Sequence, residues 1–248
     1  MTENVKIADP PHRAVHMAHR LHIILDQSGS MQTMNAATYE GARELVANPN
    51  PTDVVVCITT FNSSVVIGKD MDSETAYSAL DPDGTRCTGQ TALHDALGMV
   101  IEHELRKSGV GHVTFAIVTD GVENASVTHT QESVRKLVQQ TQAKGWRVLF
   151  LGANQDAVLE AGRVGIAAGS ALTFDGDPEH VLHAFRCASD STRRVISGED
   201  GAFTPVERMK SATRSVAQSS PRLQRRSRLA QTPMPPPILR QQSTSTGT

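Results

Sequence analysis

The chain has 248 residues, of which 38% are hydrophobic and only 4% aromatic, so a folded domain with an additional unfolded segment is expected. Residues 1–191 carry 14 Lys and Arg against 23 Asp and Glu, a net charge of −9, whereas residues 192–248 carry 10 against 3, a net charge of +7. The three cysteines, Cys57, Cys87 and Cys187, form no CxxC pair, which argues against a disulfide framework or a zinc site and favours a reducing compartment.

The first segment, residues 1–20, contains a Pro-Pro pair and three histidines and is expected to form an N-terminal arm. It has no apolar core of signal-peptide length. No run in the chain reaches the ~18 apolar residues that are needed to cross a membrane. We therefore expect a cytoplasmic protein without a membrane partner, and secretion by a route that uses no such signal is the alternative.

From residue 21 to residue 191 the apolar pattern alternates between the periods of strands and helices. Apolar runs predict strands at 21–25, 53–61, 112–119 and 146–151, and a short strand at 65–67 completes a hairpin with 53–61. Helical periodicity and composition predict helices at 35–47, 72–80, 91–106, 130–144, 154–164 and 178–190. This order predicts an α/β domain over 21–191. Its sheet is doubly wound and mostly parallel, with one antiparallel edge strand and helices on both faces.

Residues 192–248 are expected to form a basic, disordered tail, because Ser, Thr, Gln, Pro and Arg dominate and few residues can be buried. The arginines could contact an acidic partner. The tail lacks the aromatic residues that stack on bases, so no specific nucleic-acid partner is expected. A solvated tail without a partner is the plainer alternative.

Polar residues follow the strands where a parallel sheet binds its ligands, outside the carboxyl ends. Asp26, Ser28 and Ser30 follow the first strand, Asp120 ends the strand at 112–119, and Thr91 opens a helix. These five residues offer only oxygen, the ligand type that Mg²⁺ prefers and that Mn²⁺ and Ca²⁺ accept. Gly29 is expected to let the turn bend, Met31 to pack toward the core, and Thr91 to cap its helix as well.

The segments LDQSGSM, TGQTALHDAL and VTDGVEN resemble, in this order, three sequence elements of the von Willebrand factor A superfamily. The three elements cover residues 21–125, and the α/β alternation extends the resemblance to about residue 190. FLGANQDAVLEAGRVGI is similar to a stretch of small bacterial and phage members. The resemblance implies a metal-ion-dependent adhesion site whose ligands are Asp26, Ser28, Ser30, Thr91 and Asp120, some of them through water. A carboxylate of the partner protein would complete the coordination of the cation.

Several residues have simpler interpretations. Asp26, Ser28 and Ser30 could cap a turn, and the segment 154–156 is interpreted as a helix cap. His94 and Asp95 are interpreted as packing or solvent-facing residues, and Glu123 and Asn124 either shape the rim of the site or belong to a loop. The segment 81–85 matches DxDGT, a phosphotransferase motif, but a polar helical segment precedes it instead of an apolar strand.

The sequence therefore predicts a cation-dependent module that binds an Asp or Glu side chain of a partner protein, and no enzyme. One alternative is a metal-dependent hydrolase or phosphotransferase that uses the same cation, although no nucleophile or general base is evident beside the predicted ligands. Another is an interaction protein that acts through its tail, with the domain as scaffold.

Overall fold

The computed structural model describes residues 19–47, 54–81, 85–107 and 111–212. The expected arm therefore lies outside the described residues except for its last two, His19 and Arg20, which begin the first strand. Of the expected tail, the part after residue 212 lies outside. No helix in the described ranges has the length and apolar character needed to cross a membrane.

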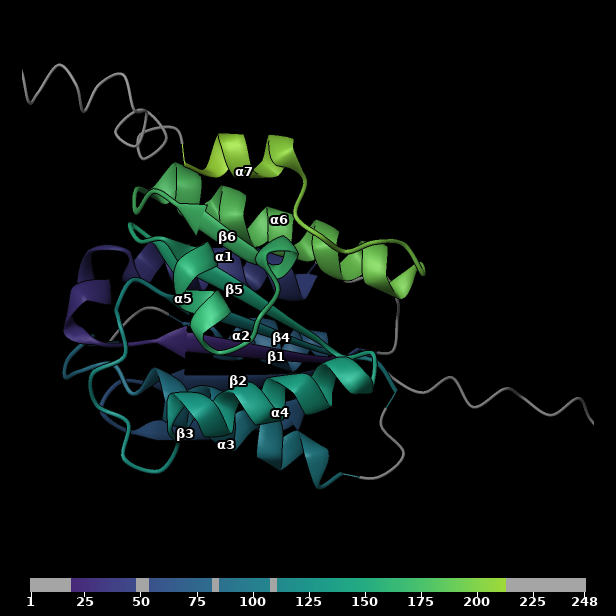
Figure 1. Cartoon of the computed structure of the whole chain (residues 1–248). Coiled ribbons are helices and arrows are strands. Elements are labelled where there is room, and N and C mark those ends of the chain that lie inside the picture. Colours follow the sequence, from purple (N-terminus) through teal and green to yellow (C-terminus); the bar gives the residue numbers. More distant parts are fainter. Residues whose placement is uncertain (1–18, 48–53, 82–84, 108–110, 213–248) are drawn as a thin grey trace, which may run out of the picture. The chain divides into compact units, whose positions relative to one another are not determined.

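Six strands form one sheet in the order β3-β2-β1-β4-β5-β6, with helices on both faces (Figure 1). The hairpin strand β3 is antiparallel to β2 and lies at one edge, and all other neighbouring pairs are parallel. The predicted doubly wound α/β fold with one antiparallel edge strand is confirmed. The strands are β1 (His19–Asp26), β2 (Val54–Phe61), β3 (Val65–Met71), β4 (Val113–Thr119), β5 (Arg147–Ala153) and β6 (Ala171–Phe174).

The helices follow the predicted order, with additions at the C-terminal side. They are α1 (Asn35–Ala47), α2 (Ser73–Ala79), α3 (Leu93–Leu105), α4 (Gln131–Ala143), α5 (Ala157–Arg163), α6 (Pro178–Ile196) and α7 (Pro205–Ser211), with short 3-10 helices η1 (Gly29–Thr33) and η2 (Ala168–Ser170). The sequence analysis did not predict β6 or α7. The boundary expected at residue 191 falls inside α6, and ordered elements continue to Ser211.

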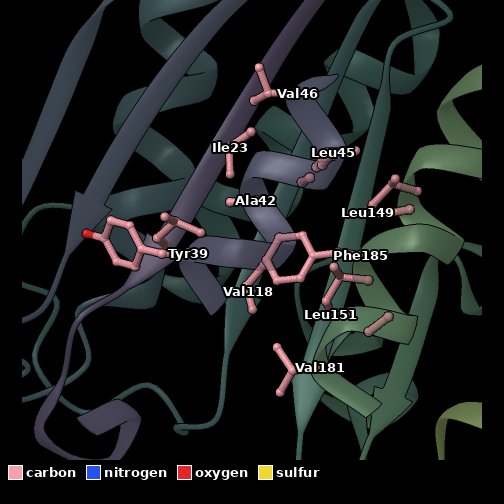
Figure 2. Close-up of a cluster of buried hydrophobic side chains, with 14 of the residues drawn as sticks. Ile23, Tyr39, Ala42, Leu45, Val46, Val118, Leu149, Leu151, Val181 and Phe185 are labelled. Carbon is pink, nitrogen blue, oxygen red and sulfur yellow. The ribbon is translucent and has the colours of Figure 1, made fainter. Parts of the chain in front are cut away.

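Each central strand buries apolar side chains on both faces because successive residues point to opposite sides. In β4, Phe115 and Ile117 belong to the core under α3, α4 and α5, whereas Ala116 and Val118 belong to the core under α1, α2 and α6. Figure 2 shows the second core, where Phe185 of α6 lies beside α1 and in the same cluster as Leu149 and Leu151 of β5. Full burial of one such large side chain contributes about 1.5–3 kcal/mol.

Helix α1 approaches α6 closely at Gly41. A Cβ atom on Gly41 would lie 2.2 Å from Cδ2 of the Phe185 ring, which is fully buried. The missing side chain therefore makes room for the ring between the two helices. This contact fixes α1, which follows η1, against the rest of the domain.

Strand β1 lies between β2 and β4, and later strands of the chain lie on both sides of it. After β1 the chain runs to β2 and β3 on one side and then returns to β4 on the other. The β1–β4 boundary is thus the point where the strand order reverses. Open α/β sheets bind ligands at such a point, outside the carboxyl ends of the strands.

Candidate metal site at the β1–β4 boundary

The structure brings the five predicted ligands together at this boundary. Asp26 is the last residue of β1, Ser28 is the N-cap residue of η1, and Ser30 lies within η1. Asp120 directly follows β4. Thr91 lies two residues before α3. We call Asp26, Ser28, Ser30, Thr91 and Asp120 the oxygen cluster. All its side chains offer hydroxyl or carboxylate oxygen.

Hydrogen bonds connect the members that come from β1 and β4. Ser28 Oγ lies 3.3 Å from Ser30 Oγ, and Ser30 Oγ donates to Asp120 Oδ1 over 2.6 Å. The Ser28 amide donates to Asp26 Oδ1 over 2.7 Å. The Thr91 hydroxyl lies beside Gly121, since a Cβ atom on Gly121 would be 2.6 Å from Thr91 Oγ1. Five oxygen-bearing side chains from three separate segments therefore meet in one place.

Asp26 is the deepest member of the oxygen cluster and is only 2% exposed. Its second carboxylate oxygen, Oδ2, accepts a hydrogen bond of 2.6 Å from Thr119 Oγ1, a contact that the sequence analysis missed. Burial raises the pKa of Asp26 and the Asp120 charge raises it further, although hydrogen bonds from Thr119 and Ser28 oppose this rise. A cation beside Asp26 and Asp120 would offset this repulsion between like charges.

The donor set fits a hard divalent cation, because every side chain offers oxygen. Hydroxyl groups and carboxylates in one cluster suit Mg²⁺, Mn²⁺ or Ca²⁺, whereas neither thiolate nor imidazole belongs to the set. The Cys87 thiol lies nearby, and burial together with the charges of Asp26 and Asp120 raises its pKa. Its Sγ contacts Asn35 Oδ1 at 3.4 Å, so it is engaged outside the oxygen cluster.

Two details differ from the sequence-based expectations. Gly29 has neither a positive φ nor a crowded Cβ position, since its nearest neighbour would be the Gly89 carbonyl oxygen at 3.7 Å. The turn therefore does not require glycine there. Thr91 does not cap α3, because the N-cap residue is Ala92 and no side chain of the cap accepts a bond. Met31 packs into the core at 1% exposure, as predicted.

The first turn of α3 is instead satisfied by the loop that follows Asp120. Glu123 Oε2 accepts the His94 amide at 2.7 Å, and Ser126 Oγ accepts the Asp95 amide at 2.9 Å. Asn124 Oδ1 accepts the Thr91 amide at 2.8 Å. From the sequence, His94 and Asp95 were interpreted as packing or solvent-facing residues, and Glu123 and Asn124 as rim or loop residues. The structure assigns them to the contact between α3 and the 121–130 loop.

Two other sequence motifs have structural explanations. Asp156 caps α5 by accepting the Leu159 amide at 3.0 Å, as expected for a helix cap. The segment before Asp81 is helix α2, so the strand that a DxDGT motif needs is not present there. Part of that motif, residues 82–84, lies outside the described residues.

A second group of possible metal ligands lies at the carboxyl end of β6. Potential ligand atoms of Asp175, Asp177 and His180 all lie within 4.8 Å of one another. Asp177 caps α6 and its Oδ2 lies 2.7 Å from His180 Nδ1. The sequence analysis did not single out this group. It is separate from the oxygen cluster and must be controlled for in any metal titration.

No family model and no curated protein matches the sequence, but solved structures do. Proximal thread matrix protein 1 from the mussel byssus is 18% identical, with a TM-score of 0.59, and the match covers 70% of this chain and 48% of that chain. The von Willebrand factor type A structure from Catenulispora acidiphila is 16% identical, with a TM-score of 0.54 and coverage of 71% and 43%. The chain has a von Willebrand factor A fold.

Two further matches concern metal and adhesion. Another structure of the mussel protein has a zinc-occupied MIDAS motif, at 18% identity and a TM-score of 0.57, with coverage of 70% and 48%. The pilus adhesin SpaC from Lactobacillus rhamnosus GG is 14% identical, with a TM-score of 0.57 and coverage of 72% and 30%. The chain spans less than half the length of each of these proteins.

Proposed function

We propose that this von Willebrand factor A domain binds a protein partner through a divalent cation held by the oxygen cluster. The observation that carries the proposal is the meeting of Asp26, Ser28, Ser30, Thr91 and Asp120 at the point where the strand order reverses. The cation would supply a concentrated positive charge. The side chains of the cluster would hold it, directly or through water.

Mg²⁺ is the proposed cation, with Mn²⁺ and Ca²⁺ as possible substitutes, because all the donors are oxygen. The zinc-occupied MIDAS motif of the mussel protein supports a divalent metal at such a site. Oxygen donors without thiolate or imidazole favour Mg²⁺ over Zn²⁺.

The proposed ligand on the partner is an Asp or Glu carboxylate. A carboxylate can replace water on a hard cation and would add a negative charge that the cation attracts. The match to a pilus adhesin supports a role in binding. We propose neither a specific nucleic-acid partner nor a membrane partner, and the basic C-terminal segment could contact acidic partners.

We propose binding rather than catalysis because the carboxylates of the loop after Asp120 and of the first turn of α3 are engaged in hydrogen bonds. Glu123 accepts four hydrogen bonds from the backbone and from Ser126, and Asp95 accepts three from the backbone. Neither is placed as an available general base. A hydrolase or phosphotransferase that uses the same cation stays the alternative.

A cytoplasmic location is also proposed. The three cysteines are free and buried in the structure, which suits a reducing compartment.

Water-proton relaxation of the Mn²⁺-loaded protein tests carboxylate binding. N-acetyl-aspartic acid amide should displace metal-bound water and lower the relaxation enhancement, whereas its asparagine counterpart should not. Mn²⁺ binding without a response to the carboxylate would contradict partner recognition through the cation. Turnover of a generic phosphate ester that disappears in Asp120→Asn would support the enzymatic alternative instead.

A further inference from the structure

The loop between Asp120 and α4 is joined to the start of α3 by reciprocal hydrogen bonds at Asn124. The Thr91 amide donates to Asn124 Oδ1 over 2.8 Å, and the Asn124 amide donates to the Thr91 carbonyl over 3.0 Å. Thr91 precedes Asn124 by 33 positions. One residue therefore fixes both backbone groups of a cluster member that comes from a different segment.

Two carboxylates on opposite sides of the same contact strengthen it. Glu123, from the loop, accepts the His94 amide of α3 at 2.7 Å as well as the Ala125 and Ser126 amides of its own loop. Asp95, from α3, accepts the loop amides of three consecutive residues at 2.6–2.9 Å; these are Val127, Thr128 and His129. The first amides of a helix lack partners within the helix, so the loop supplies them.

These hydrogen bonds also favour the charged form of both acids. Burial alone would raise the pKa of Asp95, but the amides of Val127, His129 and Thr128 lower it below its ordinary value. Burial likewise opposes ionisation of Glu123, and the bonds from His94 and Ser126 outweigh it and lower its pKa. The contact is thus built from two fixed anions that hold backbone amides.

The contact between α3 and the loop restricts how far Thr91 and Asp120 can move relative to each other. Gly121, which follows Asp120 directly, lies so close to Thr91 that a Cβ atom would be 2.6 Å from Thr91 Oγ1. The Asn124 bonds hold the Thr91 backbone against this same loop. A shift of the loop would therefore change the separation of two proposed metal ligands.

We infer that Asn124, supported by Asp95 and Glu123, is a positioning residue that sets the cation affinity of the oxygen cluster. The inference rests on the proposed function. Asn124 Oδ1 is occupied by the Thr91 amide, so its role is to orient Thr91 relative to Asp120 rather than to bind the cation. Loss of residues that orient metal ligands typically weakens metal binding about 10–100-fold.

If Asn124 only stabilised the fold, its loss would lower the unfolding midpoint without weakening metal binding. Three variants separate this structural role from the positioning role. Asn124→Ala removes the acceptor for the Thr91 amide, whereas Asn124→Asp retains an acceptor oxygen. Asp72→Ala is the matched control, because Asp72 Oδ1 accepts the Thr75 amide at 2.7 Å in the N-cap of α2, outside the oxygen cluster. The Asn124 side chain is exposed, so its removal leaves the core packing unchanged.

The experiment measures the Mn²⁺ dissociation constant by electron paramagnetic resonance, and the urea unfolding midpoint, for the full chain and each variant. We expect Asn124→Ala to bind Mn²⁺ about 10–100-fold more weakly. Asn124→Asp should bind at least as tightly as the wild type, and Asp72→Ala should lower only the unfolding midpoint.

Two results would overturn the inference alone: wild-type affinity in Asn124→Ala, or affinity in Asn124→Asp as weak as in Asn124→Ala. Failure of the wild-type protein to bind Mn²⁺ would overturn the proposed function and this inference with it. The two failures are therefore distinguishable in one set of titrations.

Discussion

Ser30 Oγ donates a hydrogen bond of 2.6 Å to Asp120 Oδ1, although the two residues lie 90 positions apart. The bond runs from the turn after β1 to the residue after β4 and so crosses the point where the strand order reverses. A hydroxyl and a carboxylate that meet there are suitable oxygen ligands for a divalent cation. This relationship links the topology of the sheet to the chemistry of the oxygen cluster.

Gly121→Ala should weaken metal binding because the new Cβ atom would lie 2.6 Å from Thr91 Oγ1 and displace that hydroxyl. We expect the Mn²⁺ dissociation constant, measured by calorimetry, to rise at least about tenfold. Gly29→Ala is the matched control, since its Cβ atom would only contact the Gly89 carbonyl oxygen at 3.7 Å. Equal affinity in the two variants would show that the Thr91 hydroxyl does not contribute.

Glu104→Gln should strongly destabilise the fold. The buried Glu104 side chain pairs with Arg20, with His22 Nε2 at 2.9 Å and with Lys107 Nζ at 3.1 Å. Burial alone would raise the pKa of Glu104, but these partners lower it to about 2. The variant removes the buried anion from Arg20 and Lys107, which then keep only the more exposed Asp70 as partner, so the free energy of unfolding should fall by about 3 kcal/mol.

Urea unfolding at neutral pH measures this loss. Glu102→Gln is the control on the same helix, where an exposed pair with Arg106 at 3.7 Å should contribute less than about 1 kcal/mol. Similar losses in both variants would mean that the buried network adds nothing specific to stability.

Stability should fall as the pH drops from about 6.5 toward 4, in part through His19. Burial, together with the charge of His112, lowers the pKa of His19 to about 4. The unfolded chain then binds a proton at a higher pH than the folded chain does, so His19 favours folding above its unfolded pKa. Its contribution of about 3 kcal/mol is lost progressively through this range.

His19→Gln isolates this contribution because glutamine does not titrate and can still bond Thr114, whose Oγ1 lies 3.2 Å from His19 Nε2. The free energy of unfolding of the variant, measured between pH 7.5 and 5, should depend less on pH than that of the wild type. Identical pH dependence in the two proteins would exclude His19 as a source.

Gly41→Ala should destabilise the domain although alanine favours helices. The added methyl group would overlap the buried Phe185 ring, and overpacking of this kind costs about 1–3 kcal/mol. Gly162→Ala, in α5, has open space around its Cβ position and should stabilise by about 0.5–1 kcal/mol. Thermal unfolding of both variants checks the opposite signs, and a stabilised Gly41→Ala would disprove the close packing of α1 on α6.

The sequence predicted a mostly parallel, doubly wound sheet and the members of the oxygen cluster, because both predictions depend on local patterns. Long apolar strands such as 112–119 and the polar residues that end them are visible in one segment at a time. Strand β6 was missed because it has only four residues, and α7 was missed although Thr204 and Glu207 form a capping box at its start.

The contact between α3 and the 121–130 loop could not be predicted in the same way. Asp95 and Glu123 bind backbone amides, and every residue type except proline offers the same amide. No pairing of residue types therefore marks this contact in the sequence. Its signal was only the presence of polar residues near Asp120, which also fits an ordinary loop.

The most direct test of the central claim is a calorimetric titration of Mg²⁺ and Mn²⁺ into the metal-free protein. Asp120→Ala removes one proposed ligand, and His180→Ala removes one member of the separate group formed with Asp175 and Asp177. The account predicts saturable one-to-one binding in the wild type and in His180→Ala, and none in Asp120→Ala. Unchanged binding in Asp120→Ala, or binding lost only in His180→Ala, would contradict a cation site in the oxygen cluster.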